Sequence, residues 1–488
     1  MGISFNASAL LNGNGIDVKS VVSELLTPQT AVIGQLQNEQ TDLSTQLGLL
    51  QGYNNNLTSL MSAVVALANP VGPLTSQSAT SSDSSILTAS AQPTAVTGSH
   101  QIVVSALATT GTIYTDPLQD GNTSFLPSGA SSGDIKLQVG GAGGTTHDIT
   151  ITQGSNDTLN TLASYINSQK WGVTASVVTD ASGARLALFS QSTGTPGALA
   201  ITNNTTSLTF NAPVGGTNAT LTIDGVPYSS ATNTITGAIS GVTLNLASAD
   251  AGTTVQLTIG PDTTQATDAI NAFVSAYNTM VGDLNTQFTV DPTTNSEGPL
   301  GGDSSLRTLQ TSLLNDATYS ITGNNGLINL ASLGIDMNND GTLTVNQTAT
   351  DTHPSLASVL ATNPGAVQSF FQNTSGTGFA QNFNNDLANL TDATDGVLNV
   401  DITGNQSQQS DLTTQINNLQ DRLSAQQAAL TLEFDQVNAT LEAYPSLLAE
   451  VTAEIGALNG NYSATPTINI NTTPATGTPA TSSSSTGS

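Results

Sequence analysis

The sequence predicts an α+β multidomain fold, in which terminal helices pair as a coiled-coil-like stalk and two β-rich domains are inserted between them. Three patterns lead to this prediction: an apolar residue at every seventh position near the N-terminus, the same repeat near the C-terminus, and period-two alternation between them. A helix with a single apolar seam needs a partner that covers the seam in water. We therefore expect the two ends of the chain to pair with each other or with neighbouring subunits.

The N-terminal repeat predicts a long helix that starts near Asp17, whose side chain can cap it, and that ends near Ala68. Pro28 is expected to interrupt or restart this helix, because proline removes a backbone hydrogen bond. The seam should be formed by Leu36, Leu43, Leu50 and Leu57.

The C-terminal repeat begins at about Leu412. Pro445 lies inside it, so we expect a kink or a break near Tyr444. The opposite face is rich in Gln, Asn, Asp and Glu, which favours an intersubunit or interhelix seam over the core of a single domain. The seam should be formed by Ile416, Leu423, Leu430, Val437, Val451 and Leu458.

Between the repeats, alternation of apolar and polar residues predicts strands. They are expected at 101–108, 136–139, 148–152, 173–178, 185–189, 219–223, 242–246 and 255–259. A short helix near 159–166 should be capped by Asn156 or Asp157. Helices are also expected at about 262–288 and 306–314, with two or three short ones between 350 and 390.

These patterns divide the chain into five parts. They are a terminal helical leg (1–40 and 431–460), a helical stalk domain with a hairpin (41–74 and 263–430), a β-rich domain (75–111 and 206–262), an inserted α+β outer domain (112–205) and a disordered Ser/Thr/Pro tail (461–488). The tail has too few apolar residues to build a core.

The charge of the chain excludes several classes of partner. Six Lys and Arg stand against 34 Asp and Glu, for a net charge of −28. The six cations are scattered, so the clusters that bind nucleic acid or an anionic membrane surface are missing. No apolar run approaches the roughly 18 residues of a membrane-spanning helix, so we expect no membrane insertion. The N-terminus lacks the basic and apolar regions of a Sec-type signal peptide.

The sequence offers little for catalysis or for a cofactor. The absence of cysteine excludes disulfides and thiolate metal sites. The histidines His100, His147 and His353 are far apart in sequence, and Trp171 is expected to be a local core residue. We predict no enzyme activity, no cofactor and no metal site.

One segment has a partial metal-binding pattern. Residues from Asp336 to Asp340, followed by Gly341, match the first half of an EF-hand calcium loop. The bidentate glutamate of such a loop is replaced by Gln347, and the flanks alternate like strands. Asn-Asp-Gly between strands is a strong hairpin signal, so a structural turn is favoured and a weak cation site is the alternative.

Short motifs along the chain resemble those of the flagellar hook-associated protein 2 family over nearly the whole length. They are GNGIDV at 13–18, HQIVVSALA at 100–108, LASYIN at 162–167, NTI at 233–235, FVSAYN at 273–278, GPLGGD at 298–303, and LGI with DGTL at 333–335 and 340–343. LASYIN looks like the "IN" motif that recurs in flagellar hook and cap proteins. One departure is that Leu26 and Thr27 stand before Pro28, where the family usually carries charge.

The resemblance implies a structural role at the distal tip of the bacterial flagellar filament. Family members leave the cell through the flagellar type III apparatus, assemble as a ring that is usually a pentamer, and place their terminal helices on the filament end. The partners implied are other copies of the chain, flagellin, hook–filament junction proteins and an export chaperone. Two alternatives are another flagellar axial protein, of the hook–filament junction type, and a surface adhesin.

Overall fold

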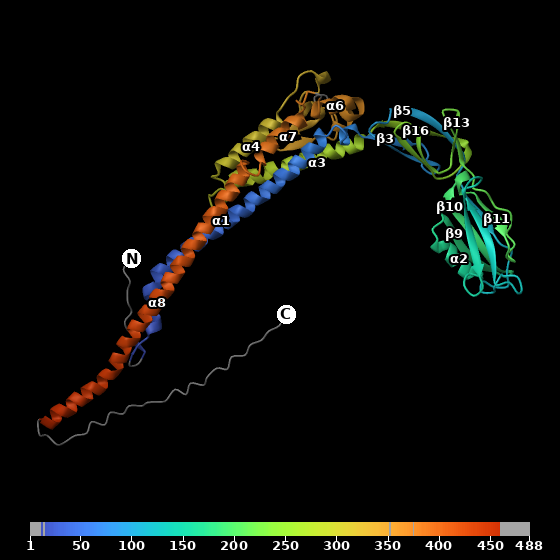
Figure 1. Cartoon of the computed structure of the whole chain (residues 1–488). Helices are drawn as coiled ribbons and strands as arrows, with labels where there is room; N and C mark the ends of the chain where they lie inside the picture. Colours follow the sequence, from blue (N-terminus) through green and yellow to red (C-terminus); the bar gives the residue numbers. More distant parts are fainter. Residues whose placement is uncertain (1–10, 13–14, 351–352, 374, 459–488) are drawn as a thin grey trace. The chain divides into compact units, whose positions relative to one another are not determined.

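The computed structural model describes residues 11–12, 15–350, 353–373 and 375–458, so the predicted tail at 461–488 lies outside the described residues (Figure 1). The chain separates into two compact units, one made from 1–45 with 405–488 and one from 46–404. Helices α1 (Val18–Ala68) and α8 (Val397–Leu458) each contribute to both units. The α+β multidomain fold predicted from the sequence is confirmed.

The first unit consists mainly of parts of α1 and α8, which run side by side in opposite directions (Figure 1). A short pairing of β1 (Leu11–Asn12) with β2 (Gly15–Ile16) precedes α1. The predicted cap is confirmed, because Asp17 Oδ1 accepts a hydrogen bond of 3.2 Å from the Ser20 backbone N–H.

Both prolines in the long helices lie inside continuous helix, so the predicted interruption at Pro28 and the predicted break near Tyr444 are wrong, whereas the alternative of a kink at Pro445 stays a prediction. A proline removes one backbone hydrogen bond, but the turns on either side keep theirs. Near Pro28, the Thr27 hydroxyl donates to the Ser23 carbonyl at 3.0 Å, in the preceding turn.

The helical domain lies in the second unit, around the second half of α1. Its other elements are α3 (Thr263–Phe288), α4 (Ser304–Ala317), α5 (Leu356–Thr362), α6 (Pro364–Phe371), α7 (Phe379–Leu390), the start of α8, and the hairpin β17 (Ile335–Met337) with β18 (Leu343–Val345). The aromatic rings of Phe273, Phe379 and Phe383 meet edge to face in its core, with centroids 5.7–5.8 Å apart. The predicted helices in this region are confirmed.

Next along the chain is a domain of two antiparallel sheets packed face to face. One sheet has the order β13-β12-β5-β16-β3 and the other β14-β15-β4. The strands are β3 (Gln77–Ser81), β4 (Leu87–Ala91), β5 (Gly98–Ala106), β12 (Ala219–Ile223), β13 (Val226–Ser230), β14 (Thr234–Ile239), β15 (Val242–Leu246) and β16 (Asp250–Pro261). Ile102, Leu221 and Leu257 from the first sheet share a buried core with Leu244 from the second.

The outer domain is inserted between β5 and β12 and has its own core. Its two sheets have the orders β6-β10-β9 and β11-β7-β8. The elements are β6 (Thr110–Tyr114), β7 (Ser132–Val139), β8 (Thr145–Thr152), α2 (Leu159–Ser168), β9 (Val173–Asp180), β10 (Gly183–Thr193) and β11 (Leu199–Asn204). Trp171 lies at the edge of this core, as predicted. Its ring stacks on the ring of His147, with the two ring centroids 4.4 Å apart.

The cap of α2 differs from the prediction. Thr158, not Asn156 or Asp157, is the N-cap, and its side chain accepts from the Thr161 N–H. Asn156 is already engaged, because its Oδ1 accepts from the Thr152 N–H at 2.8 Å and its Nδ2 donates to a strand carbonyl. A side chain that closes a strand in this way cannot also cap the helix.

Three asparagine side chains each bind the backbone of one residue in another segment of the chain. Each amide donates from Nδ2 to a backbone carbonyl and accepts at Oδ1 from the N–H of the same residue. The pairs are Asn167 with Ala175, at 2.8 and 2.7 Å, Asn233 with Ala108, at 3.0 and 2.7 Å, and Asn278 with Leu343, at 2.7 and 2.6 Å. We call these the asparagine clamps, and all three asparagines belong to the motifs that carry the family resemblance.

Replacing Asn278 by alanine should lower the free energy of unfolding of the helical domain by roughly 2–4 kcal/mol, because the backbone of buried Leu343 loses both partners. Denaturant unfolding followed by circular dichroism measures this loss. Asn271→Ala on the exposed face of the same helix is the matched control and should change stability little. Equal losses in the two variants would contradict the clamp.

Candidate interface in the terminal helices

In the first unit α1 and α8 bury a common seam. Val22, Leu26, Ile33, Leu412 and Ile416 are each at most 7% exposed. Gln40 Nε2 donates a hydrogen bond of 2.7 Å to Thr413 Oγ1 across the two helices. The seam therefore contains polar contacts as well as apolar ones.

The packing of this seam leaves a hollow of about 300 Å³. It is lined from α1 by Gln29, Val32 and Ile33 and from α8 by Leu419, Arg422 and Gln426. Gln29, Val32, Arg422 and Gln426 are exposed, so this hollow is a groove open to solvent beside the buried part of the seam.

The structure distributes the predicted seam residues over three environments. Ile416 is buried in the seam, and Leu36, Leu43, Leu423 and Leu430 are partly buried.

Leu50 and Leu57 differ from the prediction, because they lie in the core of the helical domain and are at most 2% exposed. They are not available to another subunit. Val437 and Val451 are 44% and 50% exposed. The side chain of Leu458 lies outside the described residues.

The end of α8 carries a continuous exposed apolar stripe, which we call the α8 stripe. Its members are Val437, Leu441, Tyr444, Leu448, Val451 and Ile455, with 44–62% of each side chain exposed. They are spaced alternately four and three residues apart, which places them on one face of the helix. Such a contiguous exposed apolar face is typical of an interaction site.

Leu441, Leu448 and Ile455 of the stripe were not predicted from the sequence, because the seven-residue repeat alone does not include them. The alternation of four and three residues is the signal that would have found them, because a helix seam uses two positions in every seven.

The stripe lies in a purely acidic stretch of helix. After Arg422, α8 carries no lysine or arginine, and its acidic residues there are Glu433, Asp435, Glu442, Glu450 and Glu454. Two copies of this stretch placed side by side would repel each other. A partner with neutral or basic residues beside its apolar face fits the stripe better.

The segment with the partial calcium pattern is a hairpin, as favoured. Asp340 Oδ1 accepts from the Thr342 backbone N–H at 3.0 Å, and Gly341 supplies the required positive φ of 82°. Asp336 Oδ2 lies 3.0 Å from His353 Nδ1. The two carboxylates therefore serve the local structure. Across the described residues, no three His, Asp or Glu side chains are grouped as metal ligands.

The three histidines lie in different settings and do not form a common site. His100 Nδ1 is 2.7 Å from Asp224 Oδ2 in the β-rich domain, whereas His147 stacks on Trp171 and His353 pairs with the hairpin.

One helical segment, Val18–Thr75, is long and apolar enough to cross a membrane by length and composition. This finding differs from the sequence prediction that no segment is long and apolar enough to span a membrane. Leu57, Leu60, Val64 and Leu67 of this segment are fully buried against the helical domain. Packing in a protein core accounts for their apolar character.

Comparison with protein families finds three matches along the chain. Residues 14–111 match the N-terminal model of flagellar hook-associated protein 2, and residues 216–445 match its C-terminal model. Residues 134–192 match the flagellin hook IN motif, the region that contains the clamp residue Asn167.

Similar proteins cover nearly the full length. The chain is 29% identical to the B-type flagellar hook-associated protein 2 of Pseudomonas aeruginosa, over 91% of this chain and 96% of that protein. It is 27% identical to flagellar hook-associated protein 2 of Escherichia coli K12, over 92% and 97%. Among solved structures, the D1-D2-D3 domains of the flagellar cap protein FliD from Escherichia coli match with a TM-score of 0.57 and 26% identity, over 73% of this chain and 99% of that one.

Replacing buried Ile416 by alanine should destabilise the first unit by roughly 2–4 kcal/mol, whereas Leu448→Ala should cost little because Leu448 is 57% exposed. Amide hydrogen exchange in residues 18–45 of α1 measures the difference. Faster exchange in the Ile416 variant alone is expected. If both variants accelerated exchange equally, the separation of a buried seam from a free stripe would be wrong.

Proposed function

Because the chain belongs to the flagellar hook-associated protein 2 family, we propose that it caps the distal tip of a bacterial flagellar filament, retains exported flagellin there and promotes its polymerisation. The α8 stripe is the main structural support for this proposal, because it identifies particular residues that could dock on the filament. It supplies an apolar face at the end of the terminal helix pair, beyond the part of the seam that is buried within one chain.

The size of the stripe sets the strength of one docking event. Completing the burial of a half-exposed Leu, Val or Ile side chain contributes roughly 1 kcal/mol, so the stripe contributes roughly 6 kcal/mol. Association costs at least about 4 kcal/mol in lost translational and rotational freedom. A single leg therefore binds weakly and releases readily.

Weak legs become effective when several act together. A ring of identical copies presents several stripes to one filament end, and each bound leg raises the effective concentration of the others. We therefore propose a ring-shaped homo-oligomer, a pentamer if it follows the usual family arrangement. Such a ring stays attached while one leg at a time lets go, as a cap must do when each flagellin subunit adds.

The remaining partners follow from the same surface. Before assembly the stripe is exposed, so we propose that an export chaperone covers it inside the cell. Export would then use the flagellar type III route, and the first contact outside would be with the hook–filament junction proteins. Flagellin would replace them as the filament grows. A partner with neutral or basic flanks suits the acidic stretch that carries Glu442, Glu450 and Glu454.

The double replacement of Leu441 and Leu448 by aspartate should abolish capping, because it places two charges in the stripe while leaving the buried seam intact. The variant is expressed in a strain that lacks the gene, and swimming and unpolymerised flagellin in the medium are measured. Loss of swimming and release of flagellin are expected.

The matched control is Ala453→Asp, which adds one charge to the same exposed stretch of α8 on the face away from the stripe. It should support normal swimming. Normal capping by the double variant would rule out the stripe as the docking surface, and a deletion strain that released no flagellin would rule out the cap function itself.

A further inference from the structure

Two carboxylates from different helices meet inside the helical domain. Asp316 is the second-last residue of α4 and is only 4% exposed. It contacts Asp386 of α7 through their side chains. Ionised carboxylates only accept hydrogen bonds, so these two can bond to each other only when one of them holds a proton. With both ionised, Asp316 Oδ2 is buried without a hydrogen-bond partner.

The surroundings of the pair favour the protonated form. Burial raises the pKa of Asp316 to about 8, and the hydrogen bond and charge of Asp386 add to the effect. From α3, Tyr277 is fully buried, and burial and the nearby Asp316 charge raise its pKa as well, so it stays neutral. None of the ion pairs among the described residues includes either aspartate. The carbonyl end of α4 adds negative potential.

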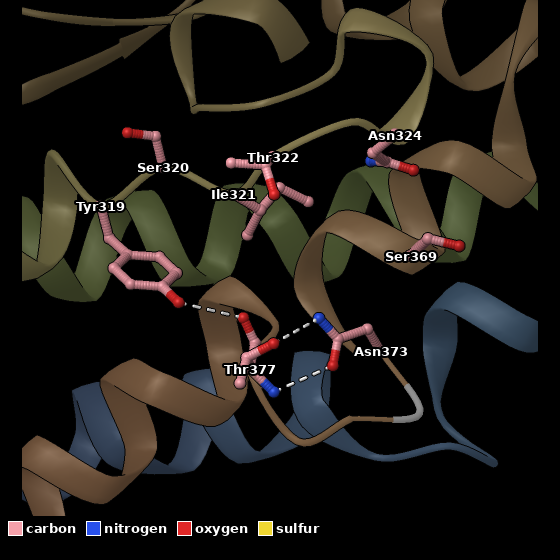
Figure 2. A pocket seen from close by; sticks show the side chains of 8 residues that line it. All are labelled: Tyr319, Ser320, Ile321, Thr322, Asn324, Ser369, Asn373 and Thr377. Carbon is pink, nitrogen blue, oxygen red and sulfur yellow. Dashed lines mark hydrogen bonds between the residues drawn. The ribbon is translucent and has the colours of Figure 1, made fainter.

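The same helices are tied a second time next to the pair. The backbone N–H of Tyr319 donates to the Asp316 carbonyl at 3.1 Å, and the Tyr319 hydroxyl donates to the Thr377 carbonyl at 3.2 Å (Figure 2). Thr377 is held by Asn373, whose Oδ1 accepts from the Thr377 N–H at 2.9 Å. Thr377 stands just before the start of α7 at Phe379.

These contacts border a surface hollow of about 440 Å³, whose lining residues are labelled in Figure 2. They come from the segment after α4, from α6 and from the connection between α6 and α7, and no charged side chain lines the hollow. A shift of the end of α4 away from α7 would pull Tyr319 from Thr377.

We propose that protonated Asp316 donates a hydrogen bond to Asp386 and acts as a proton-dependent latch, which holds the end of α4 on α7. Loss of the proton to solvent leaves two like charges facing each other in a buried place, and the end of α4 then separates from α7. This device is independent of the docking of the α8 stripe.

The direction of the pH dependence follows from proton binding. An aspartate in the unfolded chain releases its proton near its ordinary pKa of 3.8, whereas folded Asp316 keeps it up to about pH 8. Between these values the folded chain holds one more proton than the unfolded chain, so stability falls as pH rises from about 4 to about 8. Aspartates with lowered pKa, such as Asp120 and Asp392, change stability below this window.

The test is thermal unfolding of the full chain between about pH 5 and pH 8.5, with amide hydrogen exchange at 319–322 as a second readout. The unfolding midpoint of the helical domain should fall by roughly 10 °C across this range. Asp316→Asn removes the buried acid and should flatten the fall. Asp386→Asn removes the neighbouring carboxylate and should reduce the fall without abolishing it, because Asp316 stays buried. Exchange at 319–322, relative to the α3 amides, should rise above about pH 8 in the unmodified chain only.

Asp268→Asn, which replaces an exposed aspartate of α3, is the matched control and should keep the full pH slope. If one variant of the pair failed to fold, the other would carry the test. Variants of the pair that kept the full slope, or that lost stability equally at every pH, would overturn the latch and leave the capping proposal untouched.

Discussion

The architecture depends on one constraint. Each of the two long helices has an apolar face that must be covered from water. In the second unit the latter half of α1 solves this completely, because Leu57, Leu60 and Leu67 are fully buried against the helices of the domain core. In the first unit the solution is partial. The seam of α1 with α8 buries Ile33 and Ile416 but contains a glutamine contact, and the α8 stripe beyond it stays exposed.

A second constraint is the scarcity of charge. With 8% charged residues, the chain has few ion pairs to fix one segment on another. The asparagine clamps fix segments on one another instead. The asparagine amide is short and neutral, and it presents a donor and an acceptor side by side, so it can bond to the backbone N–H and C=O of one residue as a neighbouring strand would. Aspartate lacks the donor and glutamine is longer, so neither substitutes in place. This gives a physical reason for the asparagines of the family motifs.

The sequence predicted those features whose signal is local. The helices α1, α3 and α8 follow from their apolar repeats, and the cap at Asp17 follows from one residue. Strands such as Gln77–Ser81 were missed, because they contain no large apolar side chain and show no alternation. Leu50 and Leu57 fit the repeat as well as Leu43 does, and only the tertiary packing separates core from seam. Asp316 and Asp386 are remote in sequence, so nothing local relates them.

The incomplete seam is best understood from what a leg must do. A leg whose whole apolar face were buried within its own chain would have nothing left to offer a filament, whereas one with a complete intersubunit coiled coil would release too slowly to move. The α8 stripe lies between these limits, with side chains 44–62% exposed and acidic residues beside them. The acidic residues disfavour pairing of legs with one another, since like charges on adjacent helices repel. The same composition that makes the terminal helices marginal therefore keeps the stripe free for a different partner, and in the proposed ring several legs would make up for the weakness of each.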